Sequence, residues 1–104
     1  MIYELRDYWI RTGAMPEYLD AFDRIGHSIA SKYMELVGFW HTDLGEAGHA
    51  HHMWRWDSLN DRQEKRSAPF ADIDWNEKYL PVVLPLIRSQ SVKILHPTAF
   101  SPMK

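Results

Sequence analysis

The stretch Met1-Ile2-Tyr3-Glu4-Leu5-Arg6-Asp7-Tyr8-Trp9-Ile10 decides how this chain folds. Its alternation of side-chain types predicts a β-strand over residues 1–11. One face of that strand carries Glu4, Arg6 and Tyr8, and the other carries Tyr3, Leu5 and Trp9. We expect the apolar face to meet the core, and the polar face to need partners of its own. Both faces must then be covered, which is difficult for one short chain.

A helix is expected after this strand. Pro16 and Glu17 are typical of a first helical turn. Uncharged, mostly apolar residues recur at helical spacing through residues 16–35 and form one stripe. They are Leu19, Phe22, Gly26, Ile29 and Tyr33. Because glycine costs a helix roughly 1 kcal/mol relative to alanine, we interpret Gly26 as a point of close approach to the sheet.

Two strands over Leu36–Leu44 and His49–Trp56 are predicted to form a hairpin, since turn residues 45–48 separate them. A four-residue loop pairs His41 with His52, Phe39 with Trp54, and Trp40 with Met53. A slip of one residue would exchange the two faces of a strand.

A second helical region and a fourth strand follow. Ser58 begins a capping box, and the helix after it is expected to run to about Ala68 and to be closed by Pro69. A further helical segment covers residues 72–80, and two prolines predict a kinked or restarted helix after it. These are Pro81 and Pro85, and the fourth strand is expected over Ser91–His96.

The order β-α-β-β-α-β predicts an α+β, ferredoxin-like antiparallel sheet in one domain over residues 1–104. Right-handed crossovers place the first and third strands in the centre and both helical regions on one face. The other face is left bare. We expect a second copy to cover it, which gives a homodimer, a dimeric α+β barrel.

Composition excludes several classes of function. The net charge is −2 and basic residues are scattered, so we expect no nucleic-acid partner. No apolar run approaches the roughly 20 residues of a membrane helix, so we expect no membrane partner. The chain has no cysteine, which excludes thiolate chemistry and fits a cytoplasmic location. Five tryptophans, five tyrosines and four phenylalanines favour interfaces and small-molecule pockets.

Several stretches in order along the whole chain carry a family resemblance. They are Ile2-Tyr3-Glu4-Leu5-Arg6 with Tyr8, the Gly13 connector, Gly38-Phe39-Trp40-His41-Thr42 with Gly45, His52-Met53-Trp54-Arg55-Trp56-Asp57-Ser58-Leu59 with Asp61-Arg62, Ser89-Gln90, and Pro97-Thr98-Ala99-Phe100-Ser101-Pro102. Together they resemble the NIPSNAP family of the dimeric α+β barrel superfamily. Trp56, His41 and the approach His49-Ala50-His51 depart from the family pattern.

The resemblance implies a fold and a dimer, but no settled activity. Relatives in the superfamily include cofactor-poor monooxygenases, haem-degrading enzymes and lactone isomerases. They use a pocket between sheet and helices. Fold alone does not determine chemistry.

One candidate site is the strand face that carries His52, Trp54 and Trp56. A histidine beside two indoles is suited to act as a general base or to orient an aromatic or carbonyl substrate. The structural alternative is a core histidine flanked by packing tryptophans. The expected pocket lining is Trp40, Trp54, Trp56, Phe39 and His41.

Glu4, Arg6 and Tyr8 are the other catalytic candidates. In a functional interpretation Arg6 holds a substrate carboxylate while Glu4 or Tyr8 moves a proton. In a structural one, Glu4 and Arg6 form a buried ion pair near the dimer contact that maintains strand register.

His49 and His51 form a His-x-His pair, with His41 across the hairpin. Such a pair can bind zinc or copper if a third ligand is supplied by His52, Asp43 or an acid from elsewhere. Because the ligand set is incomplete in the sequence, no metal site and no cofactor are predicted.

The leading interpretation is a homodimer that binds a small aromatic or lipophilic molecule between sheet and helices. Its chemistry would be cofactor-light, either proton abstraction or oxygen insertion, with His52 as the candidate base. The alternative is a non-catalytic binding or stress-response module that acts through its dimer surface. The alternative predicts a pocket filled by the chain's own tryptophans.

Overall fold

The computed structural model describes residues 1–104. Four antiparallel strands form one sheet in the order β2-β3-β1-β4. They are β1 (Ile2–Ile10), β2 (Glu35–His41), β3 (His49–Trp56) and β4 (Ile87–Leu95). The predicted α+β fold, with the first and third strands in the centre, is confirmed. β4 begins at Ile87, four residues before the predicted start.

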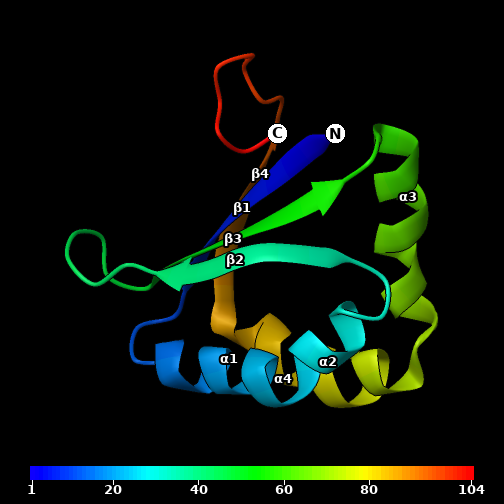
Figure 1. Cartoon of the computed structure of the whole chain (residues 1–104). Coiled ribbons are helices and arrows are strands. Elements are labelled where there is room, and N and C mark those ends of the chain that lie inside the picture. The colour runs from blue at the N-terminus through cyan, green and yellow to red at the C-terminus, as the bar shows by residue number, and fades with distance from the viewer.

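The helices lie on one side of this sheet, and no helix covers the other side (Figure 1). The first helix consists of α1 (Met15–Ala21), a π-helical stretch (Phe22–Gly26) and α2 (His27–Ala30). It ends five residues before the predicted end. The second region consists of α3 (Leu59–Ser67), a 3₁₀ turn (Ala68–Ala71), a π-helical stretch (Trp75–Tyr79), α4 (Leu80–Val83) and a final 3₁₀ turn (Leu84–Leu86).

Local sequence accounts for several helix boundaries. Ser58 is the N-cap of α3, and its side chain accepts a hydrogen bond from the Asp61 backbone N–H at 3.0 Å. Pro69 stands in the 3₁₀ turn where α3 ends, because its ring cannot continue a helix. Pro81 lies in the first turn of α4, which follows the π-helical stretch without a gap, and Pro85 lies in the final 3₁₀ turn.

Gly26 makes its close approach to another helical segment, and not to the sheet as predicted. A Cβ at this position would lie 2.5 Å from Cε1 of Tyr79. Tyr79 belongs to the π-helical stretch before α4 and is itself buried. Because Gly26 has no side chain, the first helix can contact the helical segment that contains Tyr79.

The predicted register of the hairpin is wrong by two residues. Phe39 pairs with His52 and Trp40 with His51, and the register shifts between Leu36 and Gly38. The connection is longer than four residues because Gly48 pairs with the end of β1, where its carbonyl accepts a hydrogen bond from Ile10 N–H at 2.7 Å. A shift of two residues preserves which face each side chain occupies.

The expected orientation of β1 is reversed. The polar side chains of Glu4, Arg6 and Tyr8 lie beneath the helices, together with His52 and Trp54 of β3. Hydrophobicity alone did not predict this orientation, because Glu4, Arg6 and Tyr8 form hydrogen bonds with one another, which offset the usual cost of burying polar groups. The face without helices carries Leu5, Asp7, Trp9, Trp40, His49, His51 and Met53.

Candidate active site beneath the helices

The polar face of β1 is organised around Glu4, which is fully buried. Arg62 of α3 donates to the carboxylate from both Nε and Nη2, at 2.8 and 3.2 Å. Arg6 Nη1 donates to Oε2 at 2.5 Å, and Trp56 Nε1 donates to Oε1 at 3.0 Å. Burial raises the pKa of Glu4, but hydrogen bonds from Arg62 and Arg6 outweigh it and hold the pKa below its ordinary value. Glu4 is therefore an ionised anchor for α3.

The guanidinium group of Arg6 donates hydrogen bonds to three side chains of the protein. Its Nε donates to Tyr8 Oη at 3.0 Å, and its Nη2 donates to Gln90 Oε1 at 3.1 Å, in addition to the bond with Glu4. Burial lowers the pKa of Arg6, while Tyr8 and Glu4 raise it, and the net shift is upward. These bonds support the structural interpretation of the Glu4–Arg6 pair. The pair lies on the helix side of the sheet, and not on the bare face where a dimer contact was expected.

His52 lies between aromatic rings. Phe39 stacks on it with ring centroids 4.8 Å apart, and the Tyr8 ring meets it edge-on at the same distance. Burial, reinforced by the charge of Arg6, lowers the pKa of His52 to about 3. The imidazole is consequently neutral near pH 7.

The tautomer of His52 follows from its one hydrogen bond. Trp54 Nε1 donates to His52 Nδ1 at 2.7 Å, and an indole N–H is only ever a donor. Nδ1 therefore accepts, and the single proton of the neutral ring resides on Nε2. Nε2 is buried and has no partner in the protein. In this arrangement His52 can donate to a ligand oxygen, but it has no free lone pair with which to act as a base.

A cavity of about 220 Å³ lies between the sheet and the helices, and most of its lining is apolar. Arg6, Tyr8, Phe39, His52 and Trp54 line it, as the sequence led us to expect. Glu4, Trp40, His41 and Trp56 do not line it. Glu4 and Trp56 lie deeper, bonded to each other. Trp40 is on the opposite face, and His41 is exposed at the end of β2.

The helices contribute lining residues that sequence reasoning missed. These include Tyr18, Phe22, Trp75 and Tyr79. Burial raises the pKa of both Tyr18 and Tyr79, so both phenols stay protonated. The hydrophobic spacing of the first helix placed Phe22 on its buried face but gave no sign that Phe22 lines a cavity. The π-helical stretch that follows α1 also changes the angular position of later residues. That change was not visible in the sequence.

Arg66 is the most informative lining residue that was missed. The charged run that contains Arg62, Lys65 and Arg66 is typical of a solvated helix face, yet Arg62 donates a hydrogen bond to Glu4 and Arg66 lines the cavity. Arg66 forms no hydrogen bond or ion pair with another side chain, and no acidic residue lines the cavity. Burial and the nearby Arg6 lower the pKa of Arg66, but a guanidinium stays charged near neutral pH.

Known proteins are similar to this chain in both sequence and fold. The NIPSNAP family model matches residues 3–102. The chain belongs to the NIPSNAP family. It is 32% identical over 97 residues to human protein NipSnap homolog 3A and 34% identical over 101 residues to Drosophila melanogaster protein NipSnap. Those matches cover 92% and 97% of this chain, but only 39% and 36% of the relatives.

Solved structures of NIPSNAP proteins superpose over nearly the whole chain. A family member from Agrobacterium tumefaciens is 38% identical with a TM-score of 0.94, over 99% of this chain and 98% of its own. An uncharacterized NIPSNAP domain protein from Burkholderia xenovorans is 31% identical with a TM-score of 0.91, over 98% and 99% of the two chains. A putative antibiotic biosynthesis monooxygenase from Bordetella bronchiseptica, at 9% identity and a TM-score of 0.71, shares the fold alone. In this structure no helix is both long and apolar enough to cross a bilayer.

Proposed function

We propose that this NIPSNAP protein binds a small, flat aromatic or lipophilic molecule that carries a carboxylate or carbonyl oxygen. This proposal rests on one observation: the cavity has apolar walls and hydrogen-bond donors that lack acceptors, and no acidic residue lines it. The donors are Nε2 of His52, Nε1 of Trp75 and the guanidinium of Arg66. Buried donors without partners are costly, by about 1–3 kcal/mol each. A ligand oxygen would remove that cost.

The size of the cavity limits the ligand. Its 220 Å³ lies below the roughly 300–1,000 Å³ of sites that hold drug-sized molecules. Trp54, Phe22 and Phe39 present aromatic surfaces around the space, which suits a planar apolar body. A single or fused ring with one acidic or carbonyl group meets these requirements.

Any chemistry there would depend little on cofactors and would be of the monooxygenase or isomerase type. In the proposed arrangement His52 Nε2–H stabilises negative charge that develops on a substrate oxygen, as the donors of an oxyanion hole do. A proton abstracted from the substrate would then go to another acceptor, because Nδ1 of His52 is engaged by Trp54. Catalysis by His52 as a base stays a prediction. The geometry gives stronger support to a role for His52 as a hydrogen-bond donor through Nε2.

The test is a thermal-shift and calorimetric screen of aromatic carboxylates, each paired with its primary amide. We expect carboxylates to raise the melting temperature, since a ligand that binds only the native state stabilises it. Arg66→Gln should weaken their binding about 10- to 100-fold, because hydrogen bonds to charged groups contribute about 1.5–3 kcal/mol.

Lys65→Gln is the matched control. Lys65 lies next to Arg66 in α3, pairs with Asp61 at 2.8 Å, and does not line the cavity. It should bind as the wild type does. If no carboxylate or carbonyl compound binds, or if both variants lose affinity equally, the proposed pocket is wrong.

We also propose a homodimer formed through the helix-free face, in line with the bare apolar surface of Leu5, Trp40 and Met53. The rival function, a module acting only through that surface, predicted a pocket filled by tryptophans. The cavity and the positions of Trp40 and Trp56 outside it count against that prediction. A cytoplasmic location stays a prediction.

A further inference from the structure

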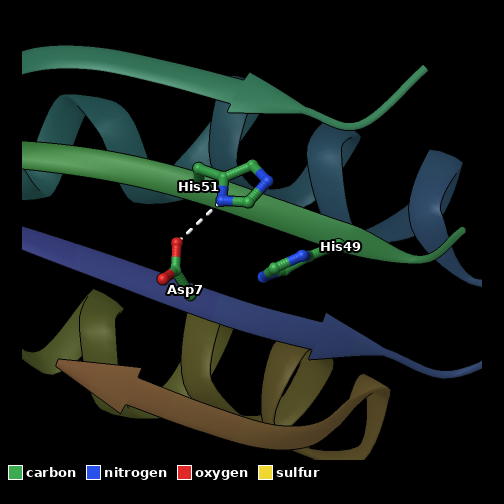
Figure 2. A group of neighbouring side chains, drawn as sticks. All are labelled: Asp7, His49 and His51. Atoms are coloured by element: carbon green, nitrogen blue, oxygen red, sulfur yellow. Dashed lines mark hydrogen bonds and ion pairs between the residues drawn. The ribbon is translucent and has the colours of Figure 1, made fainter. Parts of the chain in front are cut away.

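Asp7, His49 and His51 converge on the helix-free face of the sheet, opposite the cavity (Figure 2). Asp7 of β1 is directly paired with His51 of β3. His49 precedes His51 by two residues, so both histidines lie on the same face of the strand. One potential ligand atom from each residue lies within 4.8 Å of the other two. The acid that the His-x-His pair lacked in the sequence is therefore supplied by the neighbouring strand.

His51 is held from both sides. Its Nδ1 is hydrogen-bonded to Asp7 Oδ1 at 2.7 Å, and its Nε2 to Thr42 Oγ1 at 3.0 Å. Metal-binding histidines commonly donate their second ring N–H to an oxygen, which orients the ring and fixes the tautomer. Because the Thr42 hydroxyl can either donate or accept, it can support a His51 ring whose Nδ1 binds a metal ion.

The His49 ring is packed between two other aromatic rings, yet one of its nitrogens has no partner. Its ring stacks on Trp9 with centroids 4.1 Å apart and lies 4.0 Å from the ring of His51. Nδ1 lies 3.9 Å from a carboxylate oxygen of Glu46, while Nε2 is buried and forms no hydrogen bond in the protein. In Figure 2 the His49 ring points toward Asp7 and His51. A buried ring nitrogen without a partner, aimed at a carboxylate and a second imidazole, indicates a missing ligand.

We propose that Asp7, His49 and His51 bind one divalent transition-metal ion, with Zn²⁺ as the best-matched ion. Two imidazoles and one carboxylate are a common ligand set for zinc and for non-haem iron. Three protein ligands leave one coordination position for water or another molecule. The site is separate from the cavity, so it stands or falls independently of the proposed ligand pocket.

The required adjustment is small. Ligand bonds of about 2.0–2.1 Å in a tetrahedral site place the donor atoms about 3.3 Å apart. The Asp7–His51 pair would open slightly, and the remaining distances, at most 4.8 Å, would close by side-chain rotation. The backbone need not move, because β1 and β3 are the hydrogen-bonded central strands of the sheet.

The experiment uses tag-free protein, first treated with a chelator and then titrated with Zn²⁺ by calorimetry, in parallel with Co²⁺ followed by its visible absorption. We expect one ion per chain. Asp7→Asn, His49→Gln and His51→Gln should each weaken Zn²⁺ binding at least about 100-fold, beyond the roughly 10–100-fold typical of residues that only orient a ligand. Thr42→Val should weaken it about 10-fold.

His41→Gln and His27→Gln are the controls, since both residues are exposed imidazoles outside the cluster. Both should bind Zn²⁺ as the wild type does. Circular dichroism of every variant separates lost ligation from lost folding, and the Co²⁺ spectrum of the wild type tests the coordination without any substitution. Absence of stoichiometric binding by the wild type would overturn the proposal. So would affinity that survives the three cluster variants or falls equally in His41→Gln.

Discussion

Replacement of Glu4 by glutamine should destabilise the domain strongly, although it changes only one atom. Glu4 is fully buried and receives hydrogen bonds from Arg6, Arg62 and Trp56. Glutamine presents an NH₂ group where one carboxylate oxygen had accepted, so guanidinium N–H groups would face another donor. Arg6, only 5% exposed, would also lose its sole acidic partner.

The magnitude follows from that burial. Removal of one partner from a buried ion pair typically costs about 3–5 kcal/mol, because the remaining charge is left without compensation. Arg6 keeps Tyr8 and Gln90 as acceptors, and Arg62 is partly exposed, which reduces the loss. We therefore expect about 3 kcal/mol at pH 7, a large share of the roughly 5–15 kcal/mol that stabilises a typical domain.

The same substitution predicts a pH dependence. The pKa of Glu4 is lowered below its ordinary value near 4.5, because Arg62 and Arg6 outweigh the effect of burial. A carboxyl whose folded pKa is depressed stabilises the fold above its unfolded pKa, and this contribution is lost as pH falls through the folded pKa. The gap between wild type and Glu4→Gln should be full at pH 7 and should narrow on acidification below about pH 4.5.

Urea unfolding, monitored by tryptophan fluorescence at fixed protein concentration, measures both effects. Asp20→Asn is the matched control, since Asp20 pairs with Arg24 at 3.5 Å on the exposed surface of the first helix. That variant should be nearly as stable as the wild type, because exposed ion pairs contribute little. The reasoning is refuted if Glu4→Gln costs less than about 1 kcal/mol at pH 7, or no more than Asp20→Asn.

The remaining predictions concern the helix layer, the pocket and the bare face. Gly26→Ala should destabilise the domain by about 1–3 kcal/mol, measured by urea unfolding, because the new methyl group would lie 2.5 Å from the Tyr79 ring; a stabilised variant would contradict the packing described. Leu84→Trp, at an exposed position on the cavity lining, should reduce aromatic carboxylate binding in calorimetry while the melting temperature stays unchanged. Met53→Lys should shift the protein toward monomer in analytical ultracentrifugation, if a second copy covers the helix-free face; an unchanged molecular mass would argue against that contact.

Element order could be read from the sequence because it depends on local patterns. The alternation in β1, the cap at Ser58 and the helix-breaking Pro69 each act over a few residues, and the structure shows all three. The hairpin register was missed because Gly48 belongs to a contact with Ile10, which is distant in sequence. The first helix was predicted too long because a turn at residues 31–33 leads directly into β2.

The candidate site was only half predictable. Aromatic and polar residues of the strands were identified, since alternation places them on one face, and Phe39, His52 and Trp54 do line the cavity. Nothing in the sequence around Arg66 pointed to the cavity, because a charged helix face is usually solvated. Arg66 lines the cavity because α3 is docked on Glu4 through Arg62, one helical turn earlier.

The sequence by itself determined the strand and helix order, the family and the grouping of residues on strand faces, because these follow from periodicity and local propensity. Only the tertiary structure decided which face of β1 is buried, since Glu4 can be buried only once Arg6, Trp56 and Arg62 surround it. It also brought Asp7 beside His49 and His51, 42 and 44 positions apart along the chain. Such contacts depend on how separate strands pair, and no local pattern specifies that pairing.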